Sequence, residues 1–249
     1  MLSIYDDVPC DVLRERCAAA RVVAVERCES TMDLVHQLAA DGAAHGTVVV
    51  AEEQGAGRGR TGTSWVSPRG SGVFASILLR HPPDAPAGVL SLRIGLELAA
   101  ALQSRSPGAI QLKWPNDLLL ARRKLAGVLT EARWRGDMLE WIVVGVGVNV
   151  RDPGAEVPTA NLGESQRASD VLVDVVRSVL VAATRRGELS AAELLAYAQR
   201  DVSSGRDVTT PLEGTVLGIT ASGGVRIRTR DGDAVAVAGS LRFRSPLVE

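Results

Sequence analysis

A short loop of alternating glycine and arginine follows an apolar, β-rich run in the first quarter of the chain. The run is Thr-Val-Val-Val-Ala at 47–51, and the loop is Gly57–Gly62 (Gly-Arg-Gly-Arg-Thr-Gly) with Trp65 close behind. Glycine allows positive φ and close approach of a ligand to the backbone, and arginine offers a fixed fork of donors to phosphate or carboxylate. The pattern predicts a strand and then a loop that closes over a small anion. A merely flexible turn and a Gly/Arg nucleic-acid-binding segment stay open as alternatives.

Bulk composition narrows the class of protein. The chain has 249 residues, 46% hydrophobic and 23% charged, which suits one large soluble domain or a domain with a small module. Its net charge of −1 supplies no basic field for nucleic acid or membranes. Cys10, Cys17 and Cys28 lack C-x-x-C spacing, so we expect inert thiols in a reducing cytoplasm rather than disulfides or a zinc site. No apolar run or N-terminal signal pattern predicts a membrane span or secretion.

Hydrophobic periodicity predicts alternating strands and helices. Strands are expected at 22–25, 47–53, 73–79, 110–113, 118–120, 125–134 and 139–148, after an irregular or helical lead-in over 1–21. Helices are expected from Ser30 or Thr31 to Gly42 and over 89–103, 168–185 and 190–203. Short β-like runs separated by glycines fill 206–249, which predicts a small antiparallel barrel or sandwich and a domain boundary near residue 205.

Three more segments carry candidate chemistry. Lys113–Asp117 (Lys-Trp-Pro-Asn-Asp) places a lysine, an amide and a carboxylate around a strand-breaking proline, so we expect a turn that presents polar groups. Arg123–Leu129 contains Gly127 inside an apolar run, where glycine often marks close approach of a ligand or backbone. Gly145–Asn149 (Gly-Val-Gly-Val-Asn) leaves one sheet face bare. Taken alone, these segments also have ordinary structural explanations, as an Asn-Asp turn or as core packing.

Taken together, the four segments resemble the catalytic domain of the biotin–protein ligases, the BirA family. That family has Ser-Thr near its start, a Gln before G-R-G-R-x-G, then Trp, K-W-P-N-D, K-x-x-G-[IV]-L and G-x-G-x-N, and this order holds over about residues 22–150. The resemblance implies an α+β fold, with a mixed, mostly antiparallel sheet packed with helices and a small C-terminal SH3-like β-barrel. It also implies a ligase domain over 1–205 and the barrel over 206–249.

The resemblance implies a two-step ligase. Biotin's carboxylate attacks the α-phosphate of ATP, giving biotinyl-5′-AMP and pyrophosphate, and a lysine of a biotin carboxyl carrier protein domain then attacks the mixed anhydride. The expected small molecules are biotin, ATP and Mg²⁺. Catalysis would be electrostatic and would need no enzyme nucleophile, in keeping with the position of all three histidines outside the four motifs.

Residue roles are carried over from the motifs. The expected catalytic residues are Lys113, Lys124, Arg60 and Asp117. Biotin would be bound by Ser30, Thr31, Met32, Gln54, Arg58, Gly59, Arg60, Lys124 and Gly127. ATP or the adenylate would be bound by Arg58, Arg60, Trp65, Lys113, Asn116 and Asn149, with Trp65 near adenine and no metal ligand assigned with certainty. The loop would also exclude water from the intermediate.

The chain departs from the family pattern at three positions, one of which is Gly55 directly after Gln54, which should make the loop entrance more flexible. Met32 stands where Asn is usual, which removes a possible polar contact near biotin, and Thr63 stands where Arg or Lys is frequent, which leaves the loop one cation fewer. Only about 21 residues precede the first predicted strand, too few for a winged helix-turn-helix. We therefore expect a cytoplasmic, monofunctional ligase, monomeric or weakly dimeric, that binds neither DNA nor membrane.

Two other functions compete with this interpretation. A lipoate–protein ligase or octanoyltransferase shares the fold superfamily, but none of its motifs is intact here, and a comparison of biotin with lipoate as ligand would decide. A non-catalytic ligand-binding or RNA-binding module would use the Gly/Arg loop without any ATP–pyrophosphate exchange.

Overall fold

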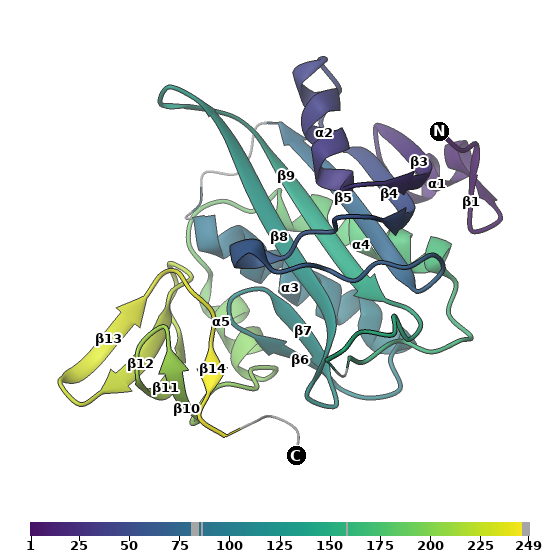
Figure 1. Cartoon of the computed structure of the whole chain (residues 1–249). Helices are drawn as coiled ribbons and strands as arrows, with labels where there is room; N and C mark the ends of the chain where they lie inside the picture. The colour runs from purple at the N-terminus through teal and green to yellow at the C-terminus, as the bar shows by residue number, and fades with distance from the viewer. Residues whose placement is uncertain (81–84, 86, 158, 246–249) are drawn as a thin grey trace.

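A seven-stranded mixed sheet forms the centre of the molecule (Figure 1). The structure is a computed structural model, and it describes residues 1–80, 85, 87–157 and 159–245. The strand order is β3-β4-β5-β9-β8-β7-β6, and only β3 and β4 run parallel. The strands are β3 (Arg21–Cys28), β4 (Thr47–Gln54), β5 (Gly72–Arg80), β6 (Ile110–Lys113), β7 (Asp117–Leu120), β8 (Arg123–Arg135) and β9 (Met138–Asn149). This is the mixed, mostly antiparallel sheet that the family resemblance implies.

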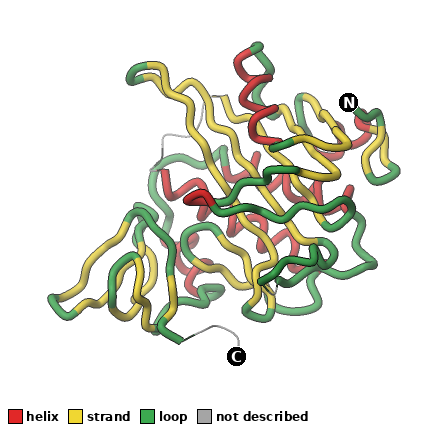
Figure 2. The backbone as a smooth tube through the Cα atoms, in the orientation of Figure 1, coloured by secondary structure: helices red, strands yellow, loops and turns green. Residues whose placement is uncertain are grey.

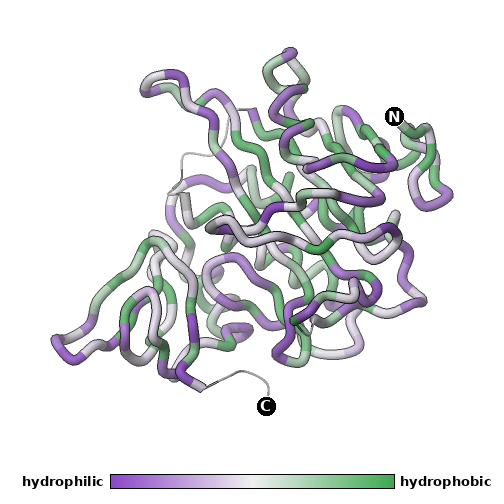
Figure 3. Tube along the Cα trace, viewed as in Figure 1, coloured by the Kyte–Doolittle hydropathy of each residue, from purple (hydrophilic) through white to green (hydrophobic). Residues whose placement is uncertain are grey.

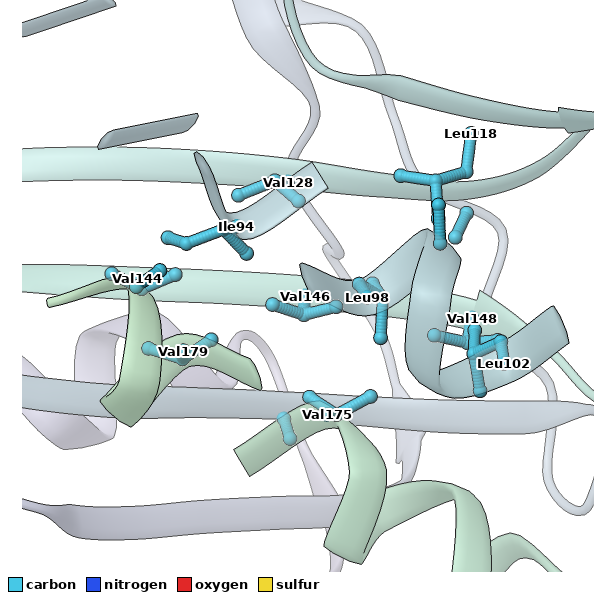
Figure 4. Close-up of a cluster of buried hydrophobic side chains, with 14 of the residues drawn as sticks. Ile94, Leu98, Leu102, Leu118, Val128, Val144, Val146, Val148, Val175 and Val179 are labelled. Atoms are coloured by element: carbon cyan, nitrogen blue, oxygen red, sulfur yellow. The ribbon is translucent and has the colours of Figure 1, made fainter. Parts of the chain in front are cut away.

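Two long helices cover one face of this sheet. These are α3 (Ala87–Leu102) and α4 (Ala168–Ala182), which pack against each other and against the central strands. Figure 4 shows their side chains meeting alternate residues of β9. The labelled residues are Ile94, Leu98, Leu102, Leu118, Val128, Val144, Val146, Val148, Val175 and Val179. Figure 3 shows the hydrophobic stretches gathered in these central elements.

The other face of the sheet carries a smaller apolar cluster and the glycine row of β9. Helix α2 (Thr31–Ala40) packs there with Val35 and Ala39 against Val49 and Val143. Because side chains alternate along a strand, Gly145 and Gly147 face the same side as Val143. Figures 1 and 2 show the segment between β4 and β5, the Gly/Arg loop, crossing β8 and β9 on this side. The loop contains a single 3₁₀ turn, η1 (Arg60–Gly62).

The N-terminal lead-in and the region of helix α5 differ from the sequence prediction. The lead-in holds a small hairpin, β1 (Ile4–Tyr5) and β2 (Val8–Pro9), before helix α1 (Cys10–Cys17). Helix α5 (Ala191–Ala198) ends well before residue 203. Its continuation instead pairs with β6, since the Leu112 amide donates to the Arg200 carbonyl (2.8 Å) and the Val202 amide to the Leu112 carbonyl (3.0 Å). Backbone pairing with β6 therefore takes the place of the last part of the helix expected over 190–203.

The C-terminal part is a five-stranded antiparallel sheet beside the β6–β7 end of the main sheet (Figure 1). Its strands are β10 (Asp207–Thr210), β11 (Gly214–Ile219), β12 (Val225–Thr229), β13 (Gly232–Ala236) and β14 (Arg242–Phe243), in the order β13-β12-β11-β10-β14. Val208, Val216, Ile227 and Leu241 are buried in the same core cluster as α3 and β9.

Two expectations about chemistry class can be compared with the structure. Cys10, Cys17 and Cys28 are all free, and burial raises the pKa of Cys17 to about 11, which makes that thiol unreactive. Within the described ranges, no helix combines the length and hydropathy that crossing a bilayer requires.

Candidate active site

A cavity of about 210 Å³ opens between the Gly/Arg loop and the glycine face of the sheet. Its walls come from the start of α2, the end of β4, the loop, and the strands β5, β7, β8 and β9, together with the β13–β14 connection. Twelve of the residues expected from the sequence line it: Ser30, Thr31, Met32, Gln54, Arg58, Gly59, Arg60, Trp65, Asn116, Asp117, Lys124 and Gly127. Residues remote in sequence therefore converge as the motifs predict.

Three glycines make room for two large side chains that line the cavity. A Cβ atom at Gly147 would lie 2.7 Å from Cζ2 of Trp65, and one at Gly127 would lie 3.0 Å from Cζ3 of the same ring. At Gly145 a Cβ would lie 2.8 Å from Sδ of Met32. Such distances are shorter than van der Waals contact. Glycine at these three positions therefore allows Trp65 and Met32 to pack directly on the backbone of the sheet.

One side of the cavity is a hydrogen-bonded polar cluster. Gln54 Oε1 accepts from the backbone amide of Thr31 (2.9 Å) and from its hydroxyl (3.2 Å), and the Thr31 hydroxyl lies 2.7 Å from that of Ser76. Gln54 Nε2 donates to the Ser67 hydroxyl (3.1 Å). Ser30 caps α2 by accepting from the Met32 amide (3.3 Å). These hydrogen bonds connect the start of α2, the end of β4 and β5 at the cavity wall.

The two loop arginines point to different anchors. Arg58 pairs with Asp33 (2.7 Å) and with Glu131 (3.4 Å); although burial opposes it, these carboxylates raise its pKa. Arg60 donates from Nη2 to the carbonyl of Gly239 (3.3 Å) in the C-terminal sheet, and burial lowers its pKa, an effect that Asp117 opposes. Thus Arg58 ties the loop to α2 and β8, whereas Arg60 ties it to the second sheet.

An ion pair stands on the β7–β8 side of the cavity. Lys124 Nζ lies 2.8 Å from Oδ1 of Asp117, without the angles of a hydrogen bond, and 5.1 Å from the centre of a Trp65 ring. An ammonium over an indole face is stabilised electrostatically. Lys124 thus joins a carboxylate, an aromatic ring and the cavity, and its charge is available to an anion that enters beside Trp65.

Two expected site residues do not line the cavity. Lys113 is partly buried and is the partner of Asp117 in the β6–β7 pairing. Burial lowers the pKa of its ammonium, with Asp117 opposing and Lys124 reinforcing this shift. Asn149 is buried, and its Nδ2 donates to the carbonyls of Lys124 (3.3 Å) and Ala160 (3.1 Å). Asn116 does line the cavity, but its Nδ2 also braces the turn through the Val128 carbonyl (2.7 Å).

Sequence reasoning missed several lining residues. Ser76 and Phe74 belong to β5, which carries no motif, and Ser240 comes from a region remote in sequence. Ser76 had a detectable signal, since it is the polar residue inside an otherwise apolar strand. Ser240 had none, because its position depends on how the C-terminal sheet docks.

Nothing in the described ranges forms a protein cage for a metal, since no three His, Cys, Asp or Glu side chains there cluster suitably. Asp117 is the carboxylate of the cavity wall, and it is already paired with Lys124. Mg²⁺ in nucleotide sites is usually held by one or two carboxylates together with substrate phosphates, and Asp117 is the carboxylate that this wall could offer to it.

Comparison with known proteins identifies the relatives of this chain. It is 36% identical over 138 residues to the bifunctional ligase/repressor BirA of Bacillus spizizenii, a match that covers 52% of this chain and 40% of that protein. It is 40% identical over 134 residues to the biotin–[acetyl-CoA-carboxylase] ligase of Paracoccus denitrificans, covering 49% of this chain and 55% of that one. The chain thus spans about half the length of these relatives or less.

A solved structure matches nearly the whole fold. The biotin protein ligase of Aquifex aeolicus in complex with biotin and ATP superposes with a TM-score of 0.75 at 24% identity, covering 90% of this chain and 99% of that one. The expected fold, catalytic sheet and C-terminal β-domain together, is confirmed. The profile of the biotin/lipoate A/B protein ligase family matches residues 24–149, the stretch that supplies the lining residues of the cavity apart from Ser240. The chain belongs to the biotin/lipoate A/B protein ligase family.

Proposed function

We propose that this protein is a biotin–protein ligase. It forms biotinyl-5′-AMP and pyrophosphate from biotin and ATP, and then transfers the biotinyl group to a lysine of a biotin carboxyl carrier protein domain in the cytoplasm. The observation that carries the proposal is the cavity itself, where the Thr31–Gln54 polar cluster and the Arg58, Arg60 and Lys124 cations surround an apolar floor. Biotin carries a group that matches each of these: a ureido group for the polar cluster, an apolar ring and chain for the floor, and a carboxylate for the cations.

The polar cluster suits the ureido end of biotin. A ureido group has two N–H donors and one carbonyl acceptor, and the hydroxyls of Thr31 and Ser76 with the Gln54 amide offer both kinds of partner. Because these side chains already bond to one another, little conformational entropy is lost when the ligand binds. Met32 contributes an apolar wall where a polar residue is usual in the family.

The cations suit the anionic half of the reaction. Two negatively charged groups, the biotin carboxylate and the α-phosphate, must approach each other. Arg58, Arg60 and Lys124 lower the cost of that approach and stabilise the charge that develops in the transition state. Lys113 adds positive potential from beside Asp117. Mg²⁺ bound to the phosphates would neutralise further charge.

Transfer to the carrier requires a neutral amine. The acceptor ammonium has an ordinary pKa near ~10.4 and must lose a proton before its nitrogen attacks the mixed anhydride, releasing AMP. Asp117 lines the cavity, and its carboxylate would orient that amine if Lys124 pairs with the ligand instead. The loop, anchored at both arginines, would exclude water from the adenylate until the carrier docks.

Biotin-dependent ATP–pyrophosphate exchange tests the first step. The purified chain with Mg²⁺ should exchange label between pyrophosphate and ATP only when biotin is added, and lipoate should not replace it. Transfer is then followed by mass spectrometry on a carboxyl carrier domain and on its acceptor Lys→Arg control. Exchange with lipoate instead of biotin would make the protein a lipoate ligase, and no exchange with either would make it a binding module.

A further inference from the structure

The Lys113 ammonium is partly buried and does not line the cavity. Lys113 ends β6, and among the described residues no carboxylate lies within ion-pair distance of its ammonium. Asp117, its neighbour across the β-pairing, is engaged by Lys124 instead. A charge taken out of water costs free energy, and the carboxylate that favours this ammonium, Asp117, is shared with Lys124, so a further contact with the ammonium is of interest.

The C-terminal sheet supplies a partner. The Lys113 ammonium lies 5.3 Å from the centre of the Phe243 ring in β14, and the guanidinium carbon of Arg206 lies 5.1 Å from the same ring. Phe243 is placed by pairing with Val208 of β10. The negative face of an aromatic ring attracts cations at such distances. One ring from the second sheet therefore contacts two cations, one of them in the Lys-Trp-Pro-Asn-Asp segment.

We propose that Phe243 is a positioning residue that holds the Lys113 ammonium in place to receive the polyphosphate of ATP. The ring is suited to this task because it stabilises the cation without neutralising it. A carboxylate in the same place would cancel the charge and repel the phosphates, whereas the ring leaves a full positive charge for the nucleotide. The inference rests on the proposed ligase function, since it takes ATP as the anion.

Anchoring of the C-terminal sheet does not by itself account for Phe243. Other contacts already hold the C-terminal sheet against the main sheet. The Trp114 indole donates to the Gly223 carbonyl (3.0 Å), and Val208 and Leu241 are buried in the main core. Phe243 is only partly buried at the margin of that core. A leucine there would retain most of the apolar packing and lose only the π face, which makes the two roles separable.

The kinetic test compares Phe243→Leu with Phe243→Tyr in biotin-dependent ATP–pyrophosphate exchange. Loss of the ring should raise the KM for ATP by roughly 2- to 30-fold, the range set by cation–π energies, and should leave the KM for biotin unchanged. Tyrosine, which keeps the π face, should restore the ATP value. Val235→Thr, at an exposed position of the same sheet, is the matched control. A leucine variant with the KM values of the wild type would overturn the proposal.

A second readout does not depend on activity. Competitive acetylation of Lys113, followed by mass spectrometry across pH, reports how easily this amine loses its proton. The leucine variant should acetylate at lower pH than wild type, because the ring favours the charged amine, while Asp117, Lys124 and Arg206 remain as they are. An unchanged profile would refute the contact. If the wild type lacks exchange altogether, the ligase proposal fails, but the acetylation profile still tests the Phe243–Lys113 contact.

Discussion

Arg60 is the residue at which the Gly/Arg loop meets the second sheet, through its bond to the Gly239 carbonyl. Arg60→Gly should remove this anchor together with one cation of the cavity. We expect the variant to release biotinyl-AMP into solution and to biotinylate lysines outside the carrier, since a loosened loop no longer retains or shields the adenylate.

The measurement for Arg60→Gly is the rate at which labelled biotinyl-AMP leaves the purified enzyme, with mass spectrometry of a bystander protein beside it. Arg230→Gly, an exposed arginine in a turn of the C-terminal sheet, serves as the control and should behave as the wild type. Tight retention of the intermediate and strict carrier specificity in Arg60→Gly would contradict the gating role.

Gly147 gives a second prediction at the residue scale. Gly147→Ala would drive a Cβ atom into the Trp65 indole, with Cζ2 only 2.7 Å away. The ring must move off the sheet, so biotin and ATP binding should weaken, and overpacking of this kind destabilises by about 1–3 kcal/mol. Thermal unfolding and calorimetric titration with biotin measure both effects.

A double variant separates clash from general damage at this position. Gly147→Ala with Trp65→Ala removes the obstructing ring, so most of the lost stability should return, although binding beside Trp65 should not. If the double variant is less stable than Gly147→Ala alone, the ring is not the source of the strain.

At the scale of elements, Arg93 connects α3 to α5 and to the segment that follows α4. From inside α3 its Nε donates to Glu193 of α5 (2.8 Å), and its other nitrogens donate to the carbonyls of Gly187 (3.1 Å) and Glu188 (2.7 Å), after α4. The side chains of Arg93 and Glu193 are 2% and 11% exposed, so the pair is largely shielded from solvent. Ser190 and Glu193 also form a capping box that starts α5.

This pair predicts how stability depends on pH. Although burial opposes it, hydrogen bonds from Arg93 and Ser190 lower the pKa of Glu193 from 4.5 to about 2. The unfolded chain therefore binds the proton first, and stability that is full above pH ~4.5 is lost as pH falls toward ~2, by up to about 3 kcal/mol.

Urea unfolding from pH 7 to pH 2 checks this expectation, with Glu193→Gln as the matched variant. Glu193→Gln leaves a buried guanidinium without its counter-charge and should be less stable than the wild type at pH 7, by about 3–5 kcal/mol. The difference should narrow as acid protonates Glu193. A difference that stays constant with pH would show that the carboxylate charge contributes nothing.

Elements were predictable where local pattern and tertiary environment agree. The helix after Ser30 and the hairpin around Gly136 carry their own capping and turn signals, and both form as expected. Helix α5 was predicted too long, because its apolar spacing does not reveal that the following backbone pairs with Leu112. Likewise, a motif could assign Asn149 to the adenylate, but not detect that its amide nitrogen already donates to the backbone carbonyls of Lys124 and Ala160.

At the scale of the whole molecule, the site is more dispersed than its motifs. The four segments within residues 22–150 account for most of the cavity wall, and they could be found because each has a local pattern. Ser240, Gly239 and Phe243 could not, since their relation to the site depends on docking of one sheet beside another. Contacts between distant segments leave no periodic trace in sequence.

The proposed boundary at residue 205 can be tested in the same terms. The C-terminal sheet shares its core with the catalytic part: Val216 and Ile227 lie in the cluster that contains α3 and β9, and the buried Trp114 indole donates to Gly223. A fragment of residues 1–205 would expose this apolar surface and leave the Trp114 donor without its acceptor. We expect it to unfold at lower temperature than the full chain, to bind a hydrophobic dye, and to lose ATP–pyrophosphate exchange.

Calorimetry of the full chain distinguishes a shared core from two independent domains. A shared core predicts one cooperative transition, since neither sheet can unfold without exposing the other's apolar surface. Trp114→Phe deletes the donor to Gly223 together with part of a buried ring, so it should lower the free energy of unfolding by about 1 kcal/mol for the hydrogen bond and further for the cavity that it leaves, and the transition should stay single. Two resolved transitions, or a 1–205 fragment as stable as the whole chain, would instead make residues 206–249 a separable domain whose contacts with Arg60 and Lys113 form only after both parts have folded.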